Sequence, residues 1–143
     1  CGDVSKTMAK FGYPHSAMEG ESLSQAIFEF DHQVTGLFEG ILTEVTNFSP
    51  EPPFRITGTL GELVMGVGGF GVTLFNQDFP EGKKLLEDQG YISSFLHQFD
   101  DFYQCVKTPG RQPFASAEFS LGEMKTAFAM ERSDREGKWI DID

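Results

Sequence analysis

The sequence predicts an α+β fold in which a mainly antiparallel, open-faced β-sheet has two main helices packed on one face. Residues 4–76 contain short runs rich in β-branched and aromatic residues, and short turn segments separate these runs. From about residue 91 the apolar residues instead recur at helical spacing. The 143 residues, 39% of them apolar, are enough for one core, so a single domain over residues 1–143 is expected.

The predicted sheet begins with a strand at residues 4–11, followed by a polar, glycine-containing loop at residues 12–22. Two longer strands at residues 23–30 and 34–45 are joined by the short polar turn 31–33, as in a hairpin. In the second of these strands Leu37 and Ile41 share one face, while Phe38 and Leu42 point to the other. Both faces of the sheet are therefore expected to be partly apolar.

A connector at residues 49–54 holds three prolines, which cannot donate the hydrogen bonds of a strand ladder. Three further strands are predicted after it, at residues 55–59, 62–67 and 71–76. The links between these three are short, so an antiparallel meander is expected.

Two helices follow the strands. The first has an apolar stripe formed by Ile92, Phe95, Leu96, Phe99, Phe102, Tyr103 and Val106, which we expect to be buried, and Pro109 ends this helix. Ser116 is the predicted N-cap of the second helix, and Gly137 its C-terminal stop. Residues 138–143 are expected to close the chain as an edge strand.

Helices on one face leave the other face of the sheet open. A contiguous exposed apolar area of more than a few hundred Å² usually marks an interaction site, so self-association through this face is the simple expectation. The alternative is an ordinary solvated sheet with scattered apolar residues.

Composition excludes several classes of partner. The net charge is −11, which repels both nucleic acid and anionic lipid, and no apolar run approaches the roughly 18 residues of a membrane helix. The two cysteines, Cys1 and Cys105, fit no disulfide framework, zinc motif or redox motif, and no export signal is visible. A reduced, cytoplasmic setting is expected.

One glycine-rich motif, at residues 66–71, has the pattern G-x-G-x-x-G of a dinucleotide-binding loop. In nucleotide-binding folds a helix follows this loop and its N-terminus faces the pyrophosphate. Here the next residues, 72–75, have the composition of a strand. We therefore interpret the motif as a hairpin turn rather than as a cofactor site.

Candidate site residues gather in the loop before the second strand, where Tyr13, His15, Glu19 and Glu21 lie close in sequence. They are candidates for a polar substrate pocket, in which the imidazole of His15 changes charge near neutral pH. The alternative is a solvated loop. The three histidines show no metal-ligand spacing, and no pair of acidic residues has the partners of a catalytic dyad, so neither a metal nor a catalytic residue is assigned.

Five short motifs occur in an order that resembles the C-terminal domain of the glucose-fructose oxidoreductase and inositol dehydrogenase (Gfo/Idh/MocA) family. They are the strand pair GESLSQAIFEFDHQVTGLFEG, the step ITGTLGELVM, the strand GVTLF and the two helices, the last of which continues into Arg135-Glu136-Gly137-Lys138-Trp139. The resemblance covers about 140 residues. Two departures are Gln33, where the family often has Gly, and Phe119, where an acidic residue is common.

The resemblance implies that the parent protein is an NAD- or NADP-dependent dehydrogenase acting on a sugar, a cyclitol or a related polyol. Its nucleotide-binding domain, its catalytic Lys-Pro motif and its Asp and His pair would lie upstream of Cys1. This chain alone is then expected to bind no cofactor and to be inactive. The implied partners are the N-terminal nucleotide-binding domain, the small-molecule substrate and further copies of the chain at the open sheet face.

Two other functions fit the sequence. The first is a free-standing, non-catalytic ligand-binding or dimerisation module of the same fold. The second is a self-sufficient enzyme that uses residues 66–71 as its cofactor loop, which the strand at residues 72–75 disfavours.

Overall fold

The computed structural model describes residues 2–14, 17–42, 54–66, 71–87 and 90–142. These residues form two compact units. Unit 1 comprises residues 1–46 and 115–143, and unit 2 comprises residues 47–114. The expectation of a single domain over residues 1–143 stays a prediction.

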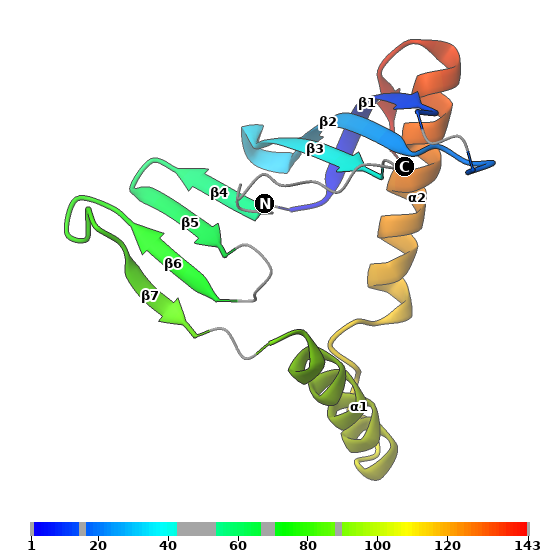
Figure 1. The fold of residues 1–143 in the computed structure, drawn as a ribbon. Coiled ribbons are helices and arrows are strands. Elements are labelled where there is room, and N and C mark those ends of the chain that lie inside the picture. The colour runs from blue at the N-terminus through cyan, green and yellow to red at the C-terminus, as the bar shows by residue number, and fades with distance from the viewer. Residues whose placement is uncertain (1, 15–16, 43–53, 67–70, 88–89, 143) are drawn as a thin grey trace. The chain divides into compact units, whose positions relative to one another are not determined.

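Unit 1 contains a four-stranded antiparallel sheet in the order β3-β2-β1-β8 (Figure 1). Its strands are β1 (Val4–Gly12), β2 (Leu23–Phe30), β3 (Thr35–Ile41) and β8 (Ile140–Asp141). The turn between β2 and β3, Asp31–Gln33, places His32 and Gln33 at positive φ and completes the predicted hairpin. The short strand β8 lies at the edge beside β1, as the sequence predicts.

The helix of unit 1, α2 (Ala117–Glu136), has the predicted ends. The hydroxyl of Ser116 accepts a hydrogen bond from the Phe119 N–H, and Gly137 adopts the left-handed conformation (φ 65°) that favours glycine. The helix packs on the face of the sheet to which Thr7, Ala9 and Ala26 belong. These three small residues are buried, and they let the helix approach the strands closely.

Unit 2 contains a second four-stranded antiparallel sheet in the order β4-β5-β6-β7, followed by helix α1 (Tyr91–Lys107). Its strands are β4 (Phe54–Gly58), β5 (Gly61–Met65), β6 (Val72–Phe75) and β7 (Lys83–Leu86). The α+β class and the antiparallel pairing are confirmed, but the strands pair as two sheets, and β7 was not predicted. The Gly66 N–H donates to the Gly71 carbonyl between two antiparallel strands, as the hairpin interpretation requires, while residues 67–70 lie outside the described part.

The two faces of the second sheet differ in polarity. The register places Phe54 beside Met65 and Val72, and Ile56 beside Leu63 and Leu74, all on one face. On the other face Glu62 accepts a hydrogen bond from Thr57 (2.8 Å) and lies 3.5 Å from the Arg55 guanidinium. One face of this sheet is thus apolar, and we call it the apolar face of unit 2.

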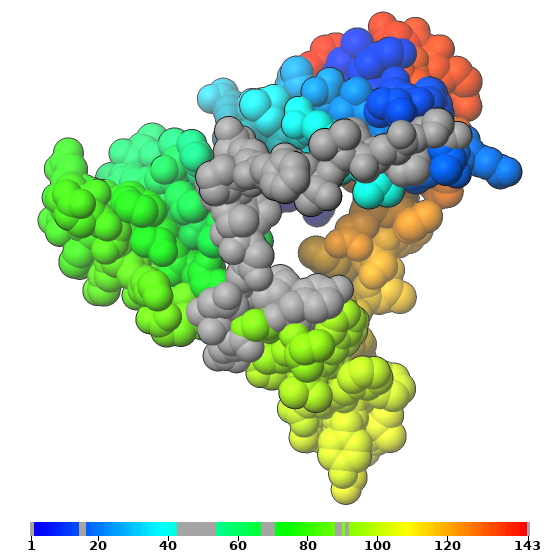
Figure 2. All heavy atoms as spheres, in the orientation of Figure 1, coloured from blue at the N-terminus to red at the C-terminus, as the bar shows by residue number. Residues whose placement is uncertain are grey.

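The apolar stripe of α1 is exposed rather than buried. Ile92, Phe99 and Val106 along this stripe are 70%, 69% and 70% exposed. The turn after α1 packs on the opposite side of the helix, because Asp101 accepts hydrogen bonds from the Arg111 guanidinium and the Phe114 N–H, both at 2.8 Å. The sequence pattern identified the stripe correctly, but its predicted burial is wrong for the described structure. Figure 2 shows the atoms of α1, in yellow-green, at the surface along the helix.

Candidate functional site

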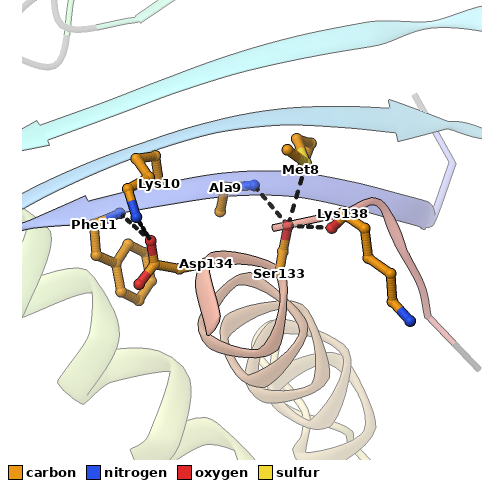
Figure 3. Close-up of polar contacts among 7 residues, drawn as sticks. All are labelled: Met8, Ala9, Lys10, Phe11, Ser133, Asp134 and Lys138. Carbon is orange, nitrogen blue, oxygen red and sulfur yellow. Dashed lines mark hydrogen bonds and ion pairs between the residues drawn. The ribbon is translucent and has the colours of Figure 1, made fainter. Parts of the chain in front are cut away.

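The C-terminal part of α2 is fixed to β1 by the side chains of Ser133 and Asp134 (Figure 3). The Ser133 hydroxyl is fully buried; it accepts a hydrogen bond from the Ala9 N–H (2.9 Å) and donates one to the Lys138 carbonyl (2.6 Å). It also lies 3.6 Å from the Met8 sulfur. Asp134 accepts from the Phe11 N–H at 3.1 Å. Consecutive helix residues therefore bind alternate strand residues, which sets the register between α2 and β1.

The carboxylate of Asp134 also binds the Lys10 ammonium at 2.6 Å. The hydrogen bond from Lys10, and secondly that from the Phe11 N–H, lower the pKa of Asp134 below its ordinary value. The carboxylate consequently stays ionised at any pH near neutrality and keeps Phe11 in place. Phe11 lies two residues before Tyr13, so this anchor positions the base of the loop that carries the candidate residues.

The loop after β1 is closed by backbone hydrogen bonds at its base. The Ser22 N–H donates to the Gly12 carbonyl at 3.0 Å, and the Ser22 carbonyl accepts from the Leu42 N–H at 2.7 Å. Ser22 itself is buried. These two bonds tie both ends of the loop to the sheet of unit 1, so the polar residues of the loop are held near the end of β1.

A hollow of about 590 Å³ in unit 1 brings together three of the four predicted site residues, Tyr13, Glu19 and Glu21. Phe11, Phe28 and Phe38 line it from the sheet, and Phe128, Met130 and Glu131 line it from α2. The fourth predicted residue, His15, lies outside the described residues. The contribution of α2, which lies more than a hundred residues further along the chain, was not predicted from the sequence.

The chemistry of this hollow combines carboxylates with aromatic rings. Glu19, Glu21 and Glu131 supply oxygens that accept hydrogen bonds, and Tyr13 supplies a hydroxyl that both donates and accepts. The rings of Phe11 and Phe28 offer an apolar surface. A ligand that fits this lining has several hydroxyl donors and a C–H face, and it carries no negative charge. Tyr13 is 64% exposed, so the hollow is open to solvent.

A larger hollow of about 860 Å³ lies between the sheet of unit 1 and the N-terminal half of α2. It is lined mainly by apolar side chains, including Phe30, Phe119 and Leu121, and it contains none of the predicted site residues. We therefore take the smaller hollow, lined by Tyr13, Glu19 and Glu21, as the candidate site.

The described residues contain neither a metal-ion site nor a helix that could span a membrane. No group of three or more His, Cys, Asp and Glu side chains in this part of the chain has an arrangement that could hold a metal ion. Among the same residues, no helix is both long enough and apolar enough to cross a membrane.

No protein-family model matches the chain, and no curated protein matches its sequence. Solved structures do match its fold. An NAD-binding oxidoreductase from Klebsiella pneumoniae superposes with a TM-score of 0.79 at 17% identity, over 99% of this chain and 46% of that one. An oxidoreductase from Agrobacterium radiobacter, solved with NAD+, L-tartaric acid and magnesium, gives a TM-score of 0.76 at 17% identity, over 97% of this chain and 43% of that one.

A third structure with this fold is an aldose-aldose oxidoreductase from Caulobacter crescentus, solved with glycerol. Its TM-score is 0.74 at 17% identity, over 99% of this chain and 42% of that one. The chain thus spans less than half of the length of each of these oxidoreductases. At this level of identity the likeness establishes the fold, which is that of one part of these enzymes.

Proposed function

We propose that this chain is the substrate-binding and oligomerisation part of an NAD(P)-dependent oxidoreductase acting on a sugar, a cyclitol or a related polyol. The observation that carries the proposal is the match of nearly the whole chain to less than half of several NAD-binding oxidoreductases. The motifs that resemble the Gfo/Idh/MocA family agree with it. In such an enzyme the nucleotide would be held by a part outside this chain, and the protein would act in the cytoplasm.

The candidate site supports a polyol as the substrate class. Carboxylates accept hydrogen bonds from hydroxyl groups, and aromatic rings pack on the C–H face of a sugar or cyclitol. Hydride transfer to or from a nicotinamide requires the reacting carbon to be held in a fixed orientation. In this proposal Tyr13, Glu19 and Glu21 line the surface that holds the substrate in a fixed orientation toward the nicotinamide.

Removing one carboxylate tests the role of the hollow. In the complete oxidoreductase, Glu21→Gln is expected to raise the KM for a polyol substrate about tenfold with a smaller effect on kcat, because a charged hydrogen-bond acceptor is lost. Glu81→Gln, an exposed site in unit 2, is the matched control and should leave KM unchanged. Equal KM values for the two variants would show that the hollow is not part of the substrate site.

The existence of the nucleotide part is tested separately by the intact mass of the native protein and by NADH binding to it. A native protein about twice the length of this chain that binds NADH is the expected result. A native protein of this length that binds sugars without NADH would instead indicate the free-standing module.

The apolar face of unit 2 supports the oligomerisation part of the proposal. Phe54, Ile56, Leu63, Met65, Val72 and Leu74 lie together on this face, and Phe54 and Ile56 are exposed. Exposed contiguous apolar area of this kind marks an interaction surface, and a second copy of the same sheet would cover it. We therefore propose that copies of the protein associate through this face.

Two substitutions at adjacent positions of β4 test this association. Ile56 lies on the apolar face and Thr57 on the polar one, so Ile56→Lys and Thr57→Lys introduce the same charge on opposite sides of one strand. Ile56→Lys is expected to dissociate the oligomer in light-scattering measurements, and Thr57→Lys to leave it intact. Dissociation by both variants, or by neither, would show that another surface holds the copies together.

A further inference from the structure

The candidate site of unit 1 has an excess of negative charge in its lining. The described residues that line this hollow include Glu19, Glu21 and Glu131, and they include no Lys, Arg or His. Apart from Ser24 and the hydroxyl of Tyr13, the other side chains of the lining are apolar. The described lining therefore carries three carboxylates and no cation of its own.

Two of these carboxylates have no cationic partner. Neither Glu19 nor Glu21 forms an ion pair with a Lys or Arg of the described part of the chain. The Lys10 ammonium, on the strand that leads into this loop, is bound to the Asp134 carboxylate at 2.6 Å. The charge of Glu19 and Glu21 is thus left for a ligand to compensate.

The third carboxylate, that of Glu131, is only weakly compensated. The Arg135 guanidinium lies 3.8 Å from it, and these two side chains are 67% and 61% exposed, so water screens the pair. Arg132, the next residue of α2, binds Glu136 at 2.8 Å. Glu131 therefore keeps most of its negative charge toward the hollow.

A ligand that enters the hollow removes water from these carboxylates. Removing water from a carboxylate is costly unless hydrogen bonds and an opposite charge replace the water. The hydroxyl groups of a neutral polyol supply only the hydrogen bonds, whereas an ammonium group supplies both the hydrogen bonds and the opposite charge. The lining therefore favours a cationic ligand over a neutral one of the same shape.

The aromatic rings of the hollow suit the same kind of ligand. Phe11, Phe28, Phe38 and Phe128 line it together with Tyr13. The face of an aromatic ring attracts a nearby ammonium group, and it also packs on the C–H groups of a sugar or cyclitol. The carboxylates of the hollow do not form a group that could hold a metal ion. An organic ligand that carries a positive charge uses both the rings and the carboxylates.

We infer that the substrate of this site is a polyol that carries an amino group, an amino sugar or an aminocyclitol, and that it binds in its ammonium form. This inference rests on the proposed function and narrows its substrate class. Glu19 and Glu21 bind the ammonium group, and the aromatic rings contact the carbon skeleton. The same carboxylates repel phosphorylated sugars and sugar acids.

Ligand pairs of nearly equal shape and different charge test the inference in the full-length protein. D-glucosamine is compared with D-glucose, D-galactosamine with D-galactose, and scyllo-inosamine with scyllo-inositol. Isothermal titration calorimetry measures the affinities at about pH 6, where the amino groups are protonated. N-acetyl-D-glucosamine is the further control, because it keeps the nitrogen and lacks the charge. In the pair that binds, the amino member should bind about tenfold more tightly than the neutral member.

Two double variants separate the hollow from the overall charge of the protein. Glu19→Gln/Glu21→Gln and Asp78→Asn/Glu81→Gln each remove two negative charges, and Asp78 and Glu81 are exposed residues of unit 2. A non-specific attraction of cations by the net charge of −11 would weaken equally in both. The preference for the amino member should fall to about twofold or less in the first variant and stay near tenfold in the second.

Several results would overturn the inference. They are equal affinities within every pair, tighter binding of the neutral member, no binding of any of these ligands, and a preference that behaves alike in both double variants. NADH binding to the full-length protein is a separate readout. A protein that binds NADH and prefers neutral polyols would keep the proposed function and lose this inference, whereas a protein that binds no NADH would refute the proposed function itself.

Discussion

The contact between α2 and β1 makes a quantitative prediction for Ser133→Ala. The Ser133 side chain is fully buried, and its hydroxyl bonds both the Ala9 N–H and the Lys138 carbonyl. The variant removes this hydroxyl and leaves both backbone groups without a hydrogen-bond partner. Each unpaired buried group costs about 1–3 kcal/mol, and the better helix propensity of alanine returns about 0.5 kcal/mol. We expect the free energy of unfolding to fall by about 1.5–5.5 kcal/mol.

Urea denaturation measures this loss, and the fluorescence of Trp139 is a suitable signal. Trp139 is the one tryptophan of the sequence and follows Lys138 directly, so it reports on the same contact. Ser120→Ala, at an exposed position of the same helix, is the matched control and should change stability by less than about 0.5 kcal/mol. A loss below about 0.5 kcal/mol for Ser133→Ala would refute the assignment of the hydroxyl as the bridge between helix and strand.

Two further predictions concern the same end of α2. Because the folded pKa of Asp134 is depressed, its contribution to stability is complete above its unfolded pKa of about 4 and is lost as the pH falls through the folded pKa. Thermal unfolding between about pH 5 and pH 2 should therefore show a shallower pH dependence for Asp134→Asn than for the wild type, and parallel curves would contradict this. Gly137→Ala places a side chain at φ 65° and should lower the free energy of unfolding by about 1 kcal/mol because of backbone strain. An unchanged free energy of unfolding in urea denaturation would show that alanine is not strained at this position.

Most elements of the fold followed from local sequence patterns. The ends of α2 were predictable because Ser116 and Gly137 are strong local signals for a helix start and a helix stop. Strand β7 was missed because its sequence, KKLL, does not alternate between apolar and polar residues. A run of four residues without a period carries too little information to be distinguished from a loop.

The position of the α1 stripe was also predictable, but its surroundings were not. Helical spacing reveals that Phe99 and Phe102 share one side of the helix, and it contains no information about what covers that side. The expectation of burial assumed a partner within the 143 residues. In the described structure Ile92, Phe99 and Val106 of this stripe are exposed.

The candidate site was only partly predictable. Tyr13, Glu19 and Glu21 were named as candidates because they lie close together in one polar loop, and the structure places all three at the same hollow. Glu131 and Phe128 were missed, because a helix brings them to the loop across a long sequence separation. Ser133 and Asp134 were missed for a related reason: polar residues near the end of a helix usually face solvent, and only the structure reveals the strand beside them.

The hydrogen bonds from β1 to α2 also bear on aggregation. Strand β8 pairs with β1 only at Lys6 and Thr7, so the strand continues beyond its neighbour with amide groups pointing toward the same edge. Such an edge is a template to which another chain can add a strand. Ser133 and Asp134 already accept the hydrogen bonds of Ala9 and Phe11 at this edge. Loss of either side chain would therefore open a growth point for intermolecular β-sheet, even in molecules that remain folded.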